Sequence, residues 1–145
     1  MKIFITGSSG FIGFSIAKHL IEKGHIVYGY DSLNNYYDAK LKKERNKILK
    51  KNKNFKFTKG LLENKILLKK TITSFKPSII IHLAAQAGVR YSLDNPEVYV
   101  NSNIIGTFNI IEISKSLKVK HLLIASSSSV YGANKKIPFK EIDKT

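Results

Sequence analysis

Apolar and polar residues follow two different patterns along this chain. Short runs of consecutive apolar or β-branched residues are typical of strands buried in a parallel sheet. The longer segments between them place apolar residues every three or four positions, as an amphipathic helix does. The short runs predict strands over Ile3–Thr6, Ile26–Asp31, Phe55–Lys59, Ile79–Ala84 and His121–Ser126. The longer segments predict helices over Phe11–Glu22, Ala39–Lys50, Asn64–Ser74 and Pro96–Leu117.

This alternation of strands and helices predicts an α/β fold with a parallel sheet. The chain of 145 residues is long enough for one domain with a hydrophobic core, and no linker or internal repeat divides it. In the last predicted helix, Asn95 is suited to cap the first turn and Pro96 to begin it. Apolar residues then recur on one face of this helix, at Val100, Ile104, Phe108 and Ile111.

The turn between the first strand and the first helix carries the strongest functional signal. Gly7, Gly10 and Gly13 follow one another at steps of three residues. Glycine allows positive φ and lets the backbone approach an anion closely. The helix that follows directs free N–H groups and the positive end of its dipole toward the same place. Strand, glycine turn and helix in this order predict a dinucleotide-binding site.

An acidic residue at the end of the second predicted strand fits the same kind of site. Asp31 lies eighteen residues after Gly13, where a Rossmann unit places the carboxylate that binds the adenosine ribose. A carboxylate repels a 2′-phosphate, and neither Ser32 nor Leu33 offers a cation. The sequence therefore favours NAD over NADP as cofactor.

Four consecutive serines follow the fifth predicted strand, over residues 126–129. Ligands of open α/β folds bind at the carboxyl edge of the sheet, where a serine hydroxyl can orient a proton transfer. The tract could also be a turn of small residues. No histidine lies nearby in the sequence to activate a serine nucleophile, which argues against a hydrolase triad.

Composition excludes several other classes of protein. The absence of cysteine excludes disulfides and thiolate metal sites, and the four histidines lack metal-ligand spacing. No signal peptide or run of about 18 apolar residues occurs, so we expect a cytoplasmic protein without a membrane span. The net charge of +15 raises the alternative of nucleic-acid binding. All basic residues except Arg45 and Arg90 are lysines without interleaved aromatics, so we expect no specific nucleic-acid partner.

Several motifs in series resemble the extended short-chain dehydrogenase/reductase family. They are Thr6-Gly7-x-x-Gly10-x-x-Gly13, Asp31, His82-Leu-Ala-Ala85 and Ser126-Ser-Ser-Ser-Val-Tyr-Gly132. Within this family the chain is similar to NAD-dependent nucleotide-sugar epimerases and dehydratases. The segments Asp31–Asp38 and Ala84–Ser92 resemble UDP-glucuronate 4-epimerases most closely. The resemblance implies a three-layer Rossmann fold with a doubly wound parallel sheet in the strand order 3-2-1-4-5.

The resemblance also implies roles for matching positions. Ser127 matches the catalytic Ser/Thr of the family. Substrate-binding positions correspond to Arg90, Ser92, Ser128 and Ser129. Cofactor-binding positions correspond to Gly7, Gly10, Phe11, Ile12, Gly13, Asp31, Ala84, Ala85, Gln86 and Asn103.

The activity implied is epimerisation at C4 of a nucleotide sugar, with UDP-glucuronate as the leading candidate. NAD oxidises C4 transiently to a 4-keto sugar and returns the hydride to the other face, and family members are often homodimers. Alternatives are a nucleotide-sugar 4,6-dehydratase, a decarboxylase, a UDP-glucose 4-epimerase or a non-catalytic NAD-binding module. No metal is implied.

The sequence departs from the family pattern at two places. The family usually has an acid after the glycine that ends the third strand, where it bonds the adenine amine, but Leu61 follows Gly60 here. The catalytic Tyr-x-x-x-Lys should lie on a helix beyond the fifth strand. Only Tyr36…Lys40 and Tyr131…Lys135 have this spacing, and neither fits that place. We therefore expect residues 1–145 to be an incomplete NAD-binding domain, an N-terminal fragment without the substrate domain.

Overall fold

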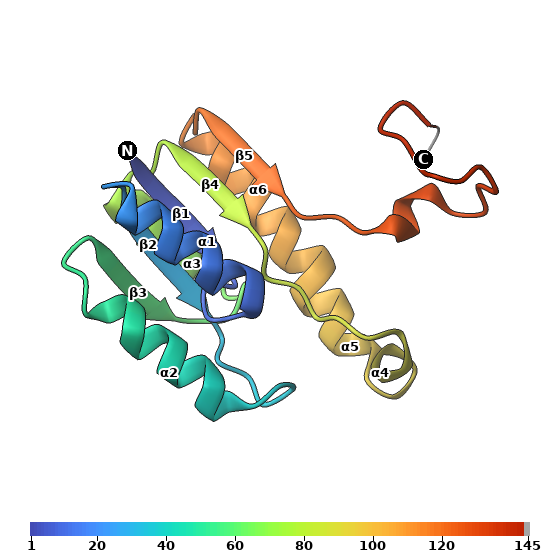
Figure 1. The fold of residues 1–145 in the computed structure, drawn as a ribbon, viewed down its shortest axis with the longest axis horizontal. Helices are drawn as coiled ribbons and strands as arrows, with labels where there is room; N and C mark the ends of the chain where they lie inside the picture. The colour runs from blue at the N-terminus through green and yellow to red at the C-terminus, as the bar shows by residue number, and fades with distance from the viewer. Residues whose placement is uncertain (144–145) are drawn as a thin grey trace.

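The computed structural model describes residues 1–143, and its core is a five-stranded parallel sheet with helices on both faces (Figure 1). The strands are β1 (Lys2–Thr6), β2 (Ile26–Asp31), β3 (Phe55–Lys59), β4 (Ile79–His82) and β5 (His121–Ile124). They lie in the order β3-β2-β1-β4-β5, and every neighbouring pair is parallel. The predicted doubly wound Rossmann sheet is confirmed.

The α-helices are α1 (Phe11–Glu22), α2 (Ala39–Lys50), α3 (Lys65–Phe75), α4 (Val89–Asp94), α5 (Pro96–Tyr99) and α6 (Gly106–Ser116). α1 and α2 pack on one face of the sheet, and α3 and α6 pack on the other. Alternation along β1 divides the core between these layers, because successive side chains of a strand point to opposite faces. Ile3 and Ile5 pack toward α1 and α2, whereas Phe4 packs toward α3 and α6.

Several predicted boundaries are corrected by the structure. β4 ends at His82 and β5 at Ile124, two residues earlier than expected in each case. α3 begins at Lys65, because the side chain of Asn64 caps it by accepting from the N–H of Leu67 at 3.0 Å. The short helix α4 was not predicted, because its six residues are too few to show the hydrophobic periodicity of a helix.

The last predicted helix is not a regular α-helix. Between α5 and α6, residues Val100–Ile105 form a π-helical segment. Asn95 precedes α5, but its side chain makes no capping hydrogen bond. The apolar face predicted at Val100, Ile104, Phe108 and Ile111 lies exposed. The face of α6 that packs into the core is instead the one with Gly106, Asn109, Ile110, Ile113 and Ser114.

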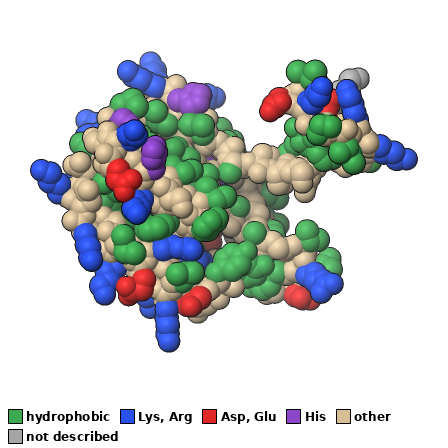
Figure 2. Space-filling view, viewed as in Figure 1, with side chains coloured by type: hydrophobic (Ala, Val, Ile, Leu, Met, Phe, Trp, Pro, Cys, Tyr) green, Lys and Arg blue, Asp and Glu red, His purple; other side chains and the backbone are tan. Residues whose placement is uncertain are grey.

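After β5 the chain leaves the sheet and runs away from it, through a short 3₁₀ turn at Ser128–Tyr131 (Figure 1). Within residues 1–143, no helix has the length and apolar composition needed to cross a bilayer. Lys and Arg side chains are dispersed over the face seen in Figure 2 and do not gather into one patch.

Candidate functional site

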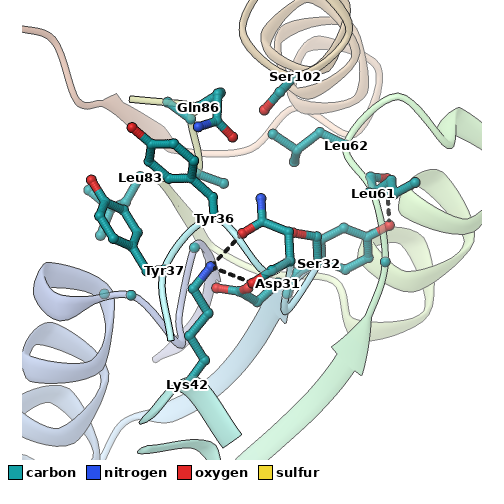
Figure 3. Close-up of a pocket in the computed structure, with 18 of the residues that line it drawn as sticks. Asp31, Ser32, Tyr36, Tyr37, Lys42, Leu61, Leu62, Leu83, Gln86 and Ser102 are labelled. Carbon is teal, nitrogen blue, oxygen red and sulfur yellow. Dashed lines mark hydrogen bonds between the residues drawn. The ribbon is translucent and has the colours of Figure 1, made fainter. Parts of the chain in front are cut away.

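A cavity of about 410 Å³ lies at the carboxyl edge of the sheet, where β1, β2 and β4 end (Figure 3). This is the edge at which open α/β sheets bind ligands. Nine of the ten residues predicted to bind a cofactor line this one cavity. They are Gly7, Gly10, Phe11, Ile12, Gly13, Asp31, Ala84, Ala85 and Gln86. The tenth, Asn103, contacts Gln86.

The glycine turn forms the wall of the cavity below α1. Gly7 has φ +71°, and a Cβ there would lie 2.9 Å from the backbone nitrogen of Ala84. A Cβ on Gly13 would collide with the carbonyl oxygen of Gly7. The first N–H of α1 with a helical acceptor is that of Phe14, which donates to the carbonyl of Gly10 at 3.0 Å. The amides of residues 11–13 therefore face the cavity region without helical acceptors, which fits an anionic group such as a pyrophosphate.

The carboxylate of Asp31 joins the glycine turn to the end of β2. Its Oδ2 accepts from the N–H of Ser9 at 3.0 Å, and its Oδ1 accepts from the N–H of Leu33 at 2.8 Å. The residue is 7% exposed. Each carboxylate oxygen can accept a further hydrogen bond, so the group remains able to bind the hydroxyls of a ribose.

A buried histidine links the ends of β1 and β4 to α6. The hydroxyl oxygen of Thr6 accepts from the N–H groups of Leu83 and Ala84 at 3.1 and 3.2 Å. Its own proton is then donated to Nδ1 of His82 at 2.7 Å, which leaves Nε2–H of His82 to donate to the hydroxyl of Thr107 at 3.0 Å. Burial lowers the pKa of His82 to about 4, so the ring is neutral near pH 7. The sequence motif contained His82 but gave no partner for it.

Asn103 fixes the segment that follows β4. Its side-chain amide pairs with both the N–H and the carbonyl of Gln86. Asn103 lies in the π-helical segment, and the preceding residues Asn101 and Ser102 line the cavity. The irregular turn thus brings three polar side chains to the site, and single π turns are frequent at functional sites.

Leu61 lines the cavity at the end of β3, where the family pattern has an acid, and is 52% exposed. The hydroxyl of Tyr30 donates to the carbonyl of Leu61 at 3.0 Å. Burial, and then the charge of Glu63, raise the pKa of Tyr30 to about 12, so its hydroxyl stays protonated. Glu63, two residues after Leu61 in the sequence, also lines the cavity.

The sequence did not predict several further residues that line the cavity. Tyr36, Tyr37 and Lys42 reach the cavity from the segment between β2 and α2 and from α2 itself. Lys42 is one of many lysines in this region, and nothing in its local sequence distinguishes it from the exposed ones. The resemblance of segment 31–38 to a family was the available signal for the two tyrosines.

The residues predicted to contact substrate do not line the cavity. Arg90 is exposed on α4, and the hydroxyl of Ser92 donates to the carbonyl of Val89 at 2.6 Å. Ser127, Ser128 and Ser129 are exposed on the chain that follows β5, where Oγ of Ser127 accepts from the N–H of Ser129 at 3.4 Å. Their roles stay predictions.

Comparison with known proteins agrees with this geometry. The family model for GDP-mannose 4,6 dehydratase matches residues 4–145. The chain belongs to this family. A Rhizobium meliloti protein named "Probable UDP-glucuronate 4-epimerase" is 50% identical over 144 residues, covering 99% of this chain and 42% of that protein. UDP-glucuronate 4-epimerase 5 of Arabidopsis thaliana is 44% identical over 146 residues, covering all of this chain and 33% of that protein. This member of the family thus spans less than half the length of these relatives.

Solved structures with the same fold include nucleotide-sugar epimerases. UDP-glucose 4-epimerase of Thermotoga maritima, solved with UDP-glucose, has a TM-score of 0.79 and 31% identity, over 94% of this chain and 41% of that one. The UDP-glucose 4-epimerase of Stenotrophomonas maltophila was solved with bound NAD and formylated UDP-arabinopyranose. Its TM-score is 0.84 at 26% identity, over 100% of this chain and 42% of that chain.

Proposed function

We propose that this chain provides the NAD-binding part of a nucleotide-sugar 4-epimerase acting on UDP-glucuronate. The observation that carries the proposal is the single cavity in which the glycine turn, Asp31 and the segment 84–86 meet. Relatives named UDP-glucuronate 4-epimerase, and epimerase structures solved with NAD, support it. The bound NAD would supply a reversible hydride acceptor for C4 of the sugar.

The residues present fit the two ends of a dinucleotide. The amides at the start of α1 would hold the pyrophosphate. The tight turn that exposes them needs glycine, because a Cβ on Gly7 would collide with the backbone of Ala84 and a Cβ on Gly13 with the backbone of Gly7. Asp31 would bind the adenosine ribose. Ala84, Ala85 and Gln86 would line the nicotinamide side, in a conformation that Asn103 holds.

Substrate-side roles are proposed for residues outside this cavity. Ser127 would orient the proton at the reacting sugar hydroxyl, with Ser128 and Ser129 beside it. Arg90 and Ser92 would contact the uronate or the diphosphate, for which a guanidinium is well suited. A complete epimerase would also need a tyrosine base and its lysine partner, and Tyr36 and Tyr131 do not offer that pair on a helix. We further propose that the assembled enzyme is a homodimer.

Titration calorimetry with NAD tests the cofactor assignment directly. The chain should bind NAD, and an Asp31→Ala variant should bind it at least about tenfold more weakly, because a ribose hydroxyl loses a charged acceptor. Asp38→Ala is the matched control, since Asp38 caps α2 outside the cavity and its loss should leave NAD binding unchanged. Lack of NAD binding by the chain would overturn the proposal.

Turnover tests the second half of the assignment. With NAD and UDP-glucuronate, the chain alone should form no UDP-galacturonate, as followed by chromatography of the nucleotide sugars. Epimerisation by these 145 residues would show that the Tyr/Lys pair lies within them, contrary to our proposal. UDP-glucose in place of UDP-glucuronate distinguishes the two substrates if activity appears.

A further inference from the structure

The most unusual charge near the cavity is the ammonium group of Lys42. This lysine is only 8% exposed, although a lysine is rarely buried unless it is paired. Within residues 1–143, no carboxylate lies within 4.0 Å of its Nζ. A buried cation without a counter-charge is unfavourable, so its position needs another explanation.

The hydrogen bonds of Lys42 are incomplete as well. Nζ donates to the side-chain Oδ1 of Asn34 at 2.6 Å and to the carbonyl of Asn34 at 3.2 Å. An ammonium group has three N–H donors, so one remains after these two bonds. The ring of Tyr37 lies 5.9 Å from Nζ and adds a weak cation–π contact. Asn34 and Tyr37 therefore position the ammonium group without satisfying it.

The ammonium group and the carboxylate of Asp31 belong to the same end of the cavity. Lys42, Asn34, Ser32 and Asp31 all line it. Figure 3 shows the Lys42 side chain reaching from α2 toward the end of β2, where Asp31 and Ser32 lie. A sugar hydroxyl both donates and accepts, so a carboxylate and an ammonium group at one end of a cavity are complementary to a vicinal diol.

We propose that Lys42 is a second binding residue for the adenosine ribose and sets the selectivity between NAD and NADP together with Asp31. This inference rests on the proposed NAD site. The ionised carboxylate of Asp31 only accepts hydrogen bonds and repels a 2′-phosphate. The ammonium group of Lys42 donates hydrogen bonds and attracts a 2′-phosphate. A second cation lies one turn along α2 and near the glycine turn, where the guanidinium of Arg45 donates to the carbonyl of Ser9 at 3.5 Å. Removing the Asp31 carboxylate should therefore convert the site to one that accepts NADP.

The test measures dissociation constants for NAD and NADP by calorimetry on the 145-residue chain and its variants. Lys42→Met should weaken NAD binding about tenfold and NADP binding more strongly. Lys42→Arg keeps the cation and should retain most of the NADP affinity. Lys40→Met removes a lysine from the exposed side of the same helix and should change neither constant. Circular dichroism melting of each variant verifies that it is folded.

A double variant tests the selectivity directly. Asp31→Ser should bind NADP about tenfold more tightly than the parent chain, since a charge repulsion is removed. In Asp31→Ser/Lys42→Met this gain should disappear. If Lys42→Met leaves both constants within twofold, Lys42 only ties the β2–α2 segment to α2 and our inference is wrong, while the NAD site stands. If the parent chain binds neither dinucleotide, the proposed function fails as well.

Discussion

Asn103 holds the backbone of Gln86 through both ends of its side-chain amide. Oδ1 accepts from the Gln86 N–H at 2.7 Å, and Nδ2 donates to the Gln86 carbonyl at 2.9 Å. The two residues are 17 positions apart, on the loop after β4 and in the π-helical segment. The geometry assigns Asn103 to the positioning of the segment 84–86, with both polar ends of its amide already engaged.

Replacing Asn103 by alanine should therefore loosen that segment. We expect the free energy of unfolding to fall by about 1–3 kcal/mol, because two backbone groups lose their partner. NAD binding should weaken about tenfold, since the binding loop must be ordered when the cofactor binds. Chemical denaturation and calorimetry measure the two effects. Asn95→Ala is the control, because Asn95 makes no side-chain capping bond. Unchanged NAD affinity in the Asn103 variant would contradict the positioning role.

The neutral state of His82 predicts a pH dependence of stability. The folded pKa of about 4 lies below the unfolded value of 6.5. Between these values the unfolded chain binds more protons, so stability is fully present above pH 6.5 and is lost as the pH falls toward 4. The loss should reach about 3 kcal/mol at its largest. Urea denaturation at a series of pH values measures it.

Two controls connect that pH dependence to His82. His121→Gln, at an exposed position of β5, should retain the dependence, whereas His82→Gln should lose most of it in this range. Nitrogen NMR of the imidazole gives a second test that needs no variant. It should find Nε2 protonated and Nδ1 unprotonated near pH 7, and the opposite tautomer would exclude the Thr6–His82–Thr107 hydrogen-bond chain.

Gly7 is required both by its conformation and by its neighbour. Gly7→Ala places a Cβ at φ +71° and against the backbone of Ala84, so it should destabilise the turn and weaken NAD binding at least about tenfold. Gly24 offers a matched control, because it has φ +80° but no atom within 4 Å of its added Cβ. Gly24→Ala should cost about 1–2 kcal/mol of stability and leave NAD binding unchanged. Equal loss of NAD affinity in both would show that the effect is one of folding alone.

Leu61 lines the cavity, and we predict that a carboxylate at this position would help to bind adenine. Leu61→Asp should tighten NAD binding about fivefold, because a charged acceptor on the cavity wall can bond the adenine amine. The residue is half exposed, so the charge remains solvated in the free protein. Leu61→Asn introduces a side chain of the same size as aspartate but without its charge, so it should give little of this gain in NAD affinity. Weaker binding in Leu61→Asp would place the adenine elsewhere.

The exposed face at Val100, Ile104, Phe108 and Ile111 should promote self-association. These side chains are 45%, 65%, 56% and 42% exposed, and contiguous apolar surface of this kind favours association. Light scattering over a concentration series should give an apparent mass that rises for the parent chain and less for Phe108→Glu. Ile48→Glu, at a 49% exposed position of α2 on the other face of the sheet, should behave as the parent chain does. A constant monomeric mass for the parent chain would contradict this prediction.

By itself the sequence determined the strands and the residue types of the glycine turn and Asp31. The strand order followed once the family resemblance was added. These features are local: apolar runs fix the strands, and positive φ with close backbone approach requires glycine at Gly7. The strand ends were less well determined, because β4 stops at His82 where its side chain turns to Thr6 and Thr107.

Only the tertiary structure decided which lysine enters the cavity, which partners His82 has and which face of α6 is buried. Thr6 and His82 are 76 residues apart, and Thr107 is 25 residues from His82. Such contacts depend on how the parallel strands bring their carboxyl ends together, which no local pattern records. Lys42 resembles its exposed neighbours in sequence, and it is buried because α2 turns that one side chain toward the end of β2.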